Sequence, residues 1–139
     1  DVSAIPESPP LGIVSNNHQE TVDYVVETLG LGDRLLTHIG REPTLQGLER
    51  TKPEPYNLER AIDDIGARNP LFVGDSNADL GAARAVGIDS AFLRRNHRTG
   101  YDLRYEPTYE IESLGEVPAL FEPAFADANR VRTHAGPRP

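Results

Sequence analysis

The chain has 139 residues, which is enough for one domain with a buried core. It carries 22 acidic and 14 basic side chains, a formal net charge of −8, and this balance argues against a nucleic-acid partner, which needs a basic face. Cysteine is absent, which excludes disulfide bonds, thiolate zinc sites and cysteine nucleophiles. Because no apolar run is long enough to span a membrane and no signal peptide is evident, we expect a cytoplasmic protein without a membrane partner.

The basic residues are unusual, because 13 are Arg and only one, Lys52, is Lys. An acidic chain with almost no lysine is typical of a halophilic source, where the acidic surface stays hydrated and its repulsion is screened. A GC-rich gene that favours arginine codons explains the same bias, and composition leaves both explanations open. Methionine is absent even from the first position, which is Asp1, so we expect this chain to be part of a longer protein.

The first half of the chain predicts two strands and a helix after an irregular lead-in. Residues 1–10 contain three prolines and no periodicity. A short buried strand is predicted over residues 11–14, followed by the polar run Ser-Asn-Asn. Apolar residues at helical spacing then predict a helix that ends at Gly30. Residues 35–39 are expected to form a second strand, and residues 40–55, with three further prolines, a long polar loop.

The second half repeats this alternation. A helix is predicted over residues 56–65 with Gly66 as its cap, then a strand over residues 71–73, a helix closed by Gly87 and a strand over residues 91–93. Residues 94–107 are expected to be an arginine-rich loop, residues 109–111 an edge strand and residues 117–121 a short helical turn. Residues 127–139 are predicted to be a disordered tail. Such alternation predicts an α/β fold with a doubly wound parallel sheet.

The segment LFVGDSNADL, residues 71–80, is the most informative part of the sequence. It predicts a buried strand, a tight turn with two carboxylates, Asp75 and Asp79, and then a helix. In a doubly wound sheet such a turn lies at the carboxyl end of a strand, where ligands bind. Two carboxylates there suit magnesium, which prefers oxygen ligands. The alternative is an acidic loop in which Asp79 provides only a favourable charge at a helix N-terminus.

Polar residues elsewhere are expected to join this turn. Ser15 ends one strand and Lys52 precedes a helix, and β-α-β winding places such points on the same edge of the sheet. A hydroxyl, an ammonium group and two carboxylates suit phosphoryl transfer. Ser15 could instead cap the helix that follows it, and Lys52 could be a surface lysine. The second alternative is weakened because the chain uses lysine nowhere else.

Three segments resemble motifs II, III and IV of the haloacid dehalogenase superfamily, and the similarity covers roughly residues 11–121. They are LGIVSNN (residues 11–17), KPEP (residues 52–55) and VGDSNAD (residues 73–79), in the family's order. The resemblance implies a doubly wound, Rossmann-like core. It also implies magnesium-dependent hydrolysis of a small phosphorylated metabolite through an aspartyl-phosphate intermediate, as in the phosphoglycolate phosphatase-like branch.

The resemblance also implies roles for individual residues. Ser15 would bind the phosphoryl group, and Asn16 would contact it or its neighbours. Lys52 would stabilise the charge of the phosphoryl group and of the nucleophile. Asp75 would be a metal ligand, and Asp79 would support the metal directly or through water. The resemblance thus gives Lys52, Asp75 and Asp79 as catalytic residues.

One departure from the family pattern is important. The family's first motif, an Asp-x-Asp after a buried strand, supplies the nucleophile, and the chain contains no Asp-x-Asp. We therefore expect residues 11–126 to be the C-terminal part of a hydrolase core, with the nucleophile, a central strand and the cap domain upstream. Either an upstream segment or another chain supplies that strand, or the sheet is broken between residues 11–14 and 71–73.

Several functions stay open at this point. The chain could be a non-catalytic domain that binds metal, phosphate or a partner, or it could belong to a phosphosugar mutase. A dehalogenase is less favoured, because two carboxylates placed for a cation serve no purpose in its metal-free chemistry. An Asp-x-Asp segment upstream in the gene would favour the phosphatase over the non-catalytic domain.

Overall fold

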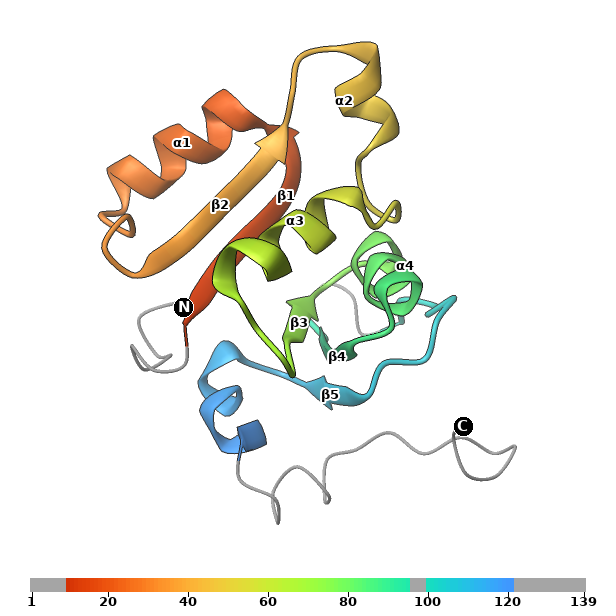
Figure 1. Ribbon diagram of the computed structural model, residues 1–139. Helices are drawn as coiled ribbons and strands as arrows, with labels where there is room; N and C mark the ends of the chain where they lie inside the picture. Colours follow the sequence, from red (N-terminus) through yellow and green to blue (C-terminus); the bar gives the residue numbers. More distant parts are fainter. Residues whose placement is uncertain (1–9, 96–99, 122–139) are drawn as a thin grey trace.

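The computed structural model describes residues 10–95 and 100–121. Most of the predicted lead-in, residues 96–99 of the predicted loop and the predicted tail over 127–139 lie outside these residues. Strands and helices alternate along the described chain (Figure 1). In order they are β1 (Leu11–His18), α1 (Gln19–Thr28), β2 (Leu35–Arg41), α2 (Leu45–Glu49), α3 (Tyr56–Ile65), β3 (Leu71–Gly74), α4 (Asn77–Val86), β4 (Asp89–Leu93) and β5 (Tyr109–Ile111). Two 3-10 turns, Leu114–Glu116 and Pro118–Phe121, follow.

The predicted α/β alternation is confirmed, with two local corrections. The predicted loop over residues 40–55 contains helix α2. This helix begins where the Thr44 hydroxyl accepts a hydrogen bond from the Gly47 N–H at 2.9 Å. With only five residues, α2 is too short to show helical periodicity in the sequence. Strand β1 is longer than predicted, and its pairing with β2 becomes irregular between Val14 and His18.

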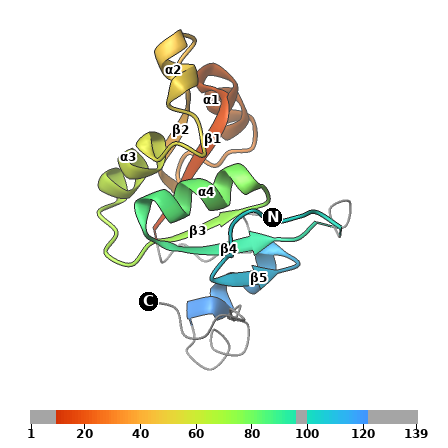
Figure 2. The ribbon, with the colours of Figure 1, turned by 90° about the vertical axis from the view of Figure 1, so that its right-hand side faces the viewer.

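The strands form two parallel sheets rather than the single predicted sheet. One sheet pairs β1 with β2, and the other has the order β3-β4-β5. Across residues 10–95 and 100–121, no hydrogen-bonded ladder joins β1 to β3. Figures 1 and 2 show β1, β2 and α1 grouped apart from β3, β4 and β5, with α3 between the groups. Of the outcomes that the sequence left open, this chain shows the broken sheet.

The three-stranded sheet is covered on both faces, which explains its short apolar strands. Phe72 packs on one face with residues of α3 and α4, while Leu71 and Val73 pack on the other. This alternation follows from the two-residue repeat of a strand. The first face includes Leu58, Ile62, Ala82 and Ala83, and the second includes Ala91, Leu93, Tyr109, Ile111, Val117 and Leu120.

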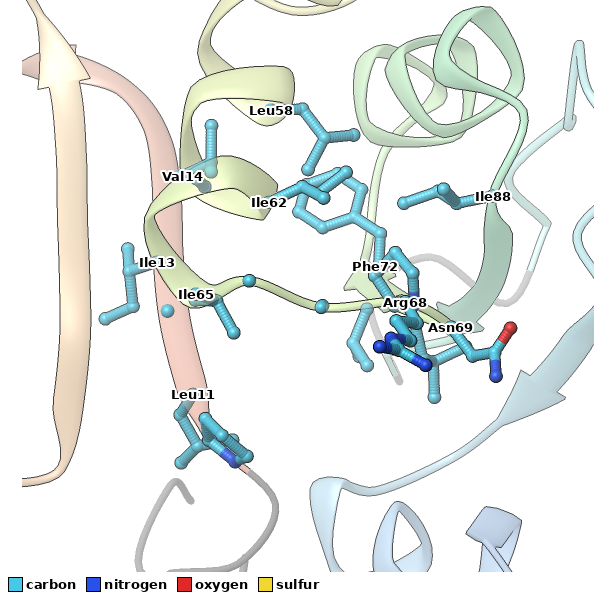
Figure 3. Close-up of a pocket in the computed structure, with 18 of the residues that line it drawn as sticks. Leu11, Ile13, Val14, Leu58, Ile62, Ile65, Arg68, Asn69, Phe72 and Ile88 are labelled. Carbon is cyan, nitrogen blue, oxygen red and sulfur yellow. The ribbon is translucent and has the colours of Figure 1, made fainter.

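A cavity of about 530 Å³ lies between the two sheets (Figure 3). Residues of both β1 and β3 line it, and helix α3 forms another of its walls. Most of its lining is apolar, and it includes Ile13, Val14, Leu58, Ile62, Phe72 and Ile88. The cavity therefore occupies the place where a ladder between β1 and β3 would run in a continuous sheet.

Within residues 10–95 and 100–121, no helix combines the length and the apolar character that a membrane span requires.

Candidate functional site

The side chain of Lys52 joins the end of β1 to the start of α4. Its ammonium nitrogen donates to the carbonyl oxygen of Val14 at 2.9 Å and to Oδ1 of Asp79 at 2.6 Å. Both charged side chains are only 10% exposed. Lys52 is therefore part of a buried ion pair and is not an ordinary surface lysine.

Asp79 also organises the turn between β3 and α4. Its Oδ2 atom accepts hydrogen bonds from the Asp75 N–H and the Ser76 hydroxyl, each at 3.0 Å. The Ser76 oxygen in turn accepts from the Asp79 N–H and caps α4. A side chain at Gly74 would place its Cβ 2.5 Å from the Asp79 Oδ2, so glycine leaves the space that this carboxylate needs. Asp79 thus serves as a helix-capping charge and as the counter-ion of Lys52.

Asn16 and Ser15 form the part of the site that comes from β1. The Asn16 side chain accepts from the Lys52 N–H at 2.9 Å and donates to the Lys52 carbonyl oxygen at 3.1 Å. The Ser15 hydroxyl accepts from the Asn17 N–H at 3.1 Å. The residue that caps α1 is His18, whose side chain makes no capping bond, so Ser15 does not cap that helix.

Asp75 lies at the same turn but faces outward. Its side chain is 37% exposed, and its Oδ2 atom accepts from Nε of Arg95 at 2.9 Å. Arg95 follows β4, the neighbour of β3 in the sheet. Arg95 was predicted to lie in a loop, and its contact with Asp75 was not predicted. The predicted order of the strands could have indicated this contact, because residues that follow adjacent parallel strands lie at the same edge of the sheet.

Asn77, the first residue of α4, was also not predicted as a site residue, and it binds the segment over residues 101–104. Its N–H donates to the Tyr101 hydroxyl oxygen at 3.0 Å, and its side chain donates to the Asp102 carbonyl oxygen at 3.0 Å. The side-chain oxygen of Asn77 accepts from the Arg104 N–H at 2.8 Å. These bonds hold the segment against the start of α4. The only feature of the sequence that pointed to these bonds is that an asparagine directly follows the residue that caps α4.

The donors at this site fit a magnesium ion in part. The exposed carboxylate of Asp75 is a suitable ligand, because Mg²⁺ is commonly held by one or two carboxylates together with waters and phosphate oxygens. No cluster of three or more His, Cys, Asp or Glu suited to a metal occurs within the described residues. The Asp79 oxygens already accept bonds from Lys52, Ser76 and the Asp75 N–H, so its role as a metal ligand stays a prediction.

Comparison with known proteins gives the family. Residues 7–93 match the model of the haloacid dehalogenase-like hydrolases. The chain belongs to this family. It is 33% identical over 117 residues to a phosphoglycolate phosphatase of Xanthomonas campestris pv. campestris, across 81% of this chain and 50% of that protein. It is 26% identical to (S)-2-haloacid dehalogenase 2 of Pseudomonas sp., across 85% of this chain and 51% of that protein.

A solved structure of this hydrolase family has a similar fold. It is a subfamily IA, variant 1 hydrolase of Geobacter sulfurreducens, with a TM-score of 0.64 and 23% sequence identity. The match covers 80% of this chain and 52% of that one. The chain thus spans about half the length of the curated relatives and of the solved structure that it matches.

The buried ion pair predicts a large effect of Asp79→Asn on stability. The substitution keeps the shape of the side chain but leaves the Lys52 ammonium buried without a counter-charge. We expect the free energy of unfolding, measured by urea denaturation, to fall by about 3 kcal/mol. Asp63→Asn, at an exposed position on α3, is the matched control and should change it by less than about 0.5 kcal/mol. Equal unfolding midpoints for the two variants would contradict the assignment.

Proposed function

We propose that this chain is part of a longer protein and that the longer protein is a magnesium-dependent phosphatase. It hydrolyses a small organic phosphate ester through an aspartyl-phosphate intermediate, and the nucleophilic Asp lies outside these 139 residues. The observation that carries the proposal is the buried ammonium of Lys52, held at a strand edge that also presents Ser15 and Asp75. A fixed positive charge at such an edge is what a transferring phosphoryl group requires.

In this proposal different residues of the chain bind and orient the phosphate and the metal. Ser15 and Asn16 orient the phosphate, and Lys52 neutralises charge on its oxygens. Asp79 holds Lys52 in place, and it supports the metal directly or through water. Asp75 would hold magnesium, which when bound would supply further positive charge to the phosphate oxygens. Arg95 already donates to Oδ2 of Asp75, so Arg95 and the cation would share this carboxylate.

The cavity between the sheets supports a nucleophile from outside this chain. Strands β1 and β3 both border it, and unpaired backbone groups buried at such an edge are costly. A parallel strand placed there would end close to Val14, whose carbonyl oxygen accepts from the Lys52 ammonium. A carboxylate at the end of that strand would lie beside this positive charge. We propose that an upstream segment or another chain supplies the strand.

The proposed substrate class rests on the names of the relatives. Those named phosphoglycolate phosphatases are 31–35% identical to this chain, whereas the two named (S)-2-haloacid dehalogenases are 26% and 28% identical. A small phosphorylated acid is therefore the first substrate to test. The second candidate function is a non-catalytic domain, favoured by the lack of an Asp-x-Asp in this chain. A phosphosugar mutase is a further alternative with similar metal chemistry.

An activity screen tests the proposal. The longer protein and residues 1–139 alone are assayed on small phosphate esters, including phosphoglycolate, with and without magnesium. We expect magnesium-dependent hydrolysis by the longer protein and none by residues 1–139, because this chain holds no nucleophile. Turnover by the purified 139-residue chain would overturn the assignment of the nucleophile. An inactive longer protein would favour the non-catalytic domain, and phosphate migration within a phosphosugar would indicate the mutase.

Substitution of Lys52 tests its role in the longer protein. We expect Lys52→Ala to reduce kcat/KM by about a hundredfold or more, since a charge on the transferring group is typically worth a few kcal/mol. Lys52→Arg should also lower kcat/KM, because a guanidinium differs from an ammonium in reach and geometry. Arg60→Ala, which removes a positive charge from an exposed position of α3, is the control. A loss below about threefold for Lys52→Ala would exclude a catalytic role.

A further inference from the structure

The side chain of Asn16 uses both of its polar ends on a single residue 36 positions away. Its oxygen accepts from the Lys52 N–H at 2.9 Å, and its nitrogen donates to the Lys52 carbonyl oxygen at 3.1 Å. This is how one peptide group pairs with another in a β-ladder, except that a side chain replaces one backbone. Asn16 thereby attaches the segment that carries Lys52 to the end of β1.

Lys52 needs such an attachment because it lies in the connection between α2 and α3, outside both sheets. Its side chain is long and flexible, and fixing it costs conformational entropy. The ammonium end is held by Val14 and Asp79 and lies 5.3 Å from the centre of the Phe72 ring. The Glu54 N–H donates to the Thr51 carbonyl oxygen at 2.9 Å and closes a turn across Lys52, but this bond does not attach the turn to β1. The two Asn16 bonds attach the backbone of Lys52 to β1.

We propose that Asn16 is a positioning residue, whose side chain fixes the backbone of Lys52 so that the ammonium stays at the end of β1. The resemblance to the family suggested instead that Asn16 contacts the phosphate. One Nδ2 hydrogen and the side-chain oxygen are already bonded to Lys52, so only the second Nδ2 hydrogen of the side chain remains to donate to a phosphate. That the position of Lys52 matters for catalysis rests on the proposed function. That Asn16 holds Lys52 in this position does not rest on it.

The lone lysine makes this proposal testable without any enzyme assay. The ε-amine of Lys52 is the only one in the 139-residue chain, so its acetylation by an N-hydroxysuccinimide ester can be followed on one peptide by mass spectrometry. Loss of two hydrogen bonds in Asn16→Ala should speed acetylation at least about tenfold. Asn16→Asp keeps the acceptor but loses the donor, and it should give an intermediate rate. Asn17→Ala, at the adjacent exposed position, should stay within about twofold.

The longer protein separates positioning from phosphate binding. Asn16→Ala should lower kcat by about tenfold or more while the inhibition constant for inorganic phosphate changes less than about threefold. Unchanged acetylation of Lys52 in Asn16→Ala, with weaker phosphate inhibition, would show that the side chain is a phosphate ligand and overturn the proposal. Faster acetylation in a protein without phosphatase activity would keep the positioning role and reject the proposed function. If circular dichroism shows that Asn16→Ala does not fold, the acetylation rate and the phosphate inhibition of Asn16→Asp test the proposal instead.

Discussion

The contact between Lys52, Val14 and Asp79 is the interaction on which the rest of the site depends. It joins the end of β1 to the first turn of α4 and so links the two separate sheets. Removing two charges from water costs several kcal/mol per ion, and a buried pair is often less stabilising than apolar residues of similar size. Stability alone therefore does not explain a buried lysine here. The proposed function explains it by a requirement for positive charge at this edge of the fold.

The second constraint is the space between the sheets. Two strands of one α/β domain border an apolar cavity, while the ladder that would join them is absent from the described residues. The match covers 52% of the similar hydrolase of known structure. The unmatched half of that hydrolase is long enough to contain a further strand. The family membership, the broken sheet and the placement of Lys52 agree with one proposal, in which a strand bearing the nucleophile completes both the sheet and the site.

Sequence periodicity predicted much of the fold because most elements have regular patterns of burial. The helix over residues 56–65 and the strand over residues 109–111 were predicted with the bounds that the structure shows. The meeting of Lys52 with Asp79 followed from the rule that parallel strands share one edge at their carboxyl ends. Helix α2 was missed because a single capping hydroxyl and a close glycine contact, rather than an apolar stripe, define it.

Several other long-range contacts were not predicted from the sequence. The Arg95 bond to Asp75 requires β4 to lie beside β3, and the Asn77 bonds require residues 101–104 to fold back on α4. The Asn16 bonds to Lys52 join β1 to the connection between α2 and α3, and no local sequence pattern predicts this contact. Side-chain bonds to distant backbone groups are therefore the part of the site for which structure was needed.

Hydrogen–deuterium exchange would test most directly whether a strand fills the space between the sheets. The amides of β1 and β3 would be compared between residues 1–139 alone and the longer protein, with β4 as the internal reference because its neighbours β3 and β5 are both present. The account predicts that β1 and β3 gain protection in the longer protein by about tenfold or more, while β4 changes little. Equal protection of β1 and β3 in the two proteins would contradict the account.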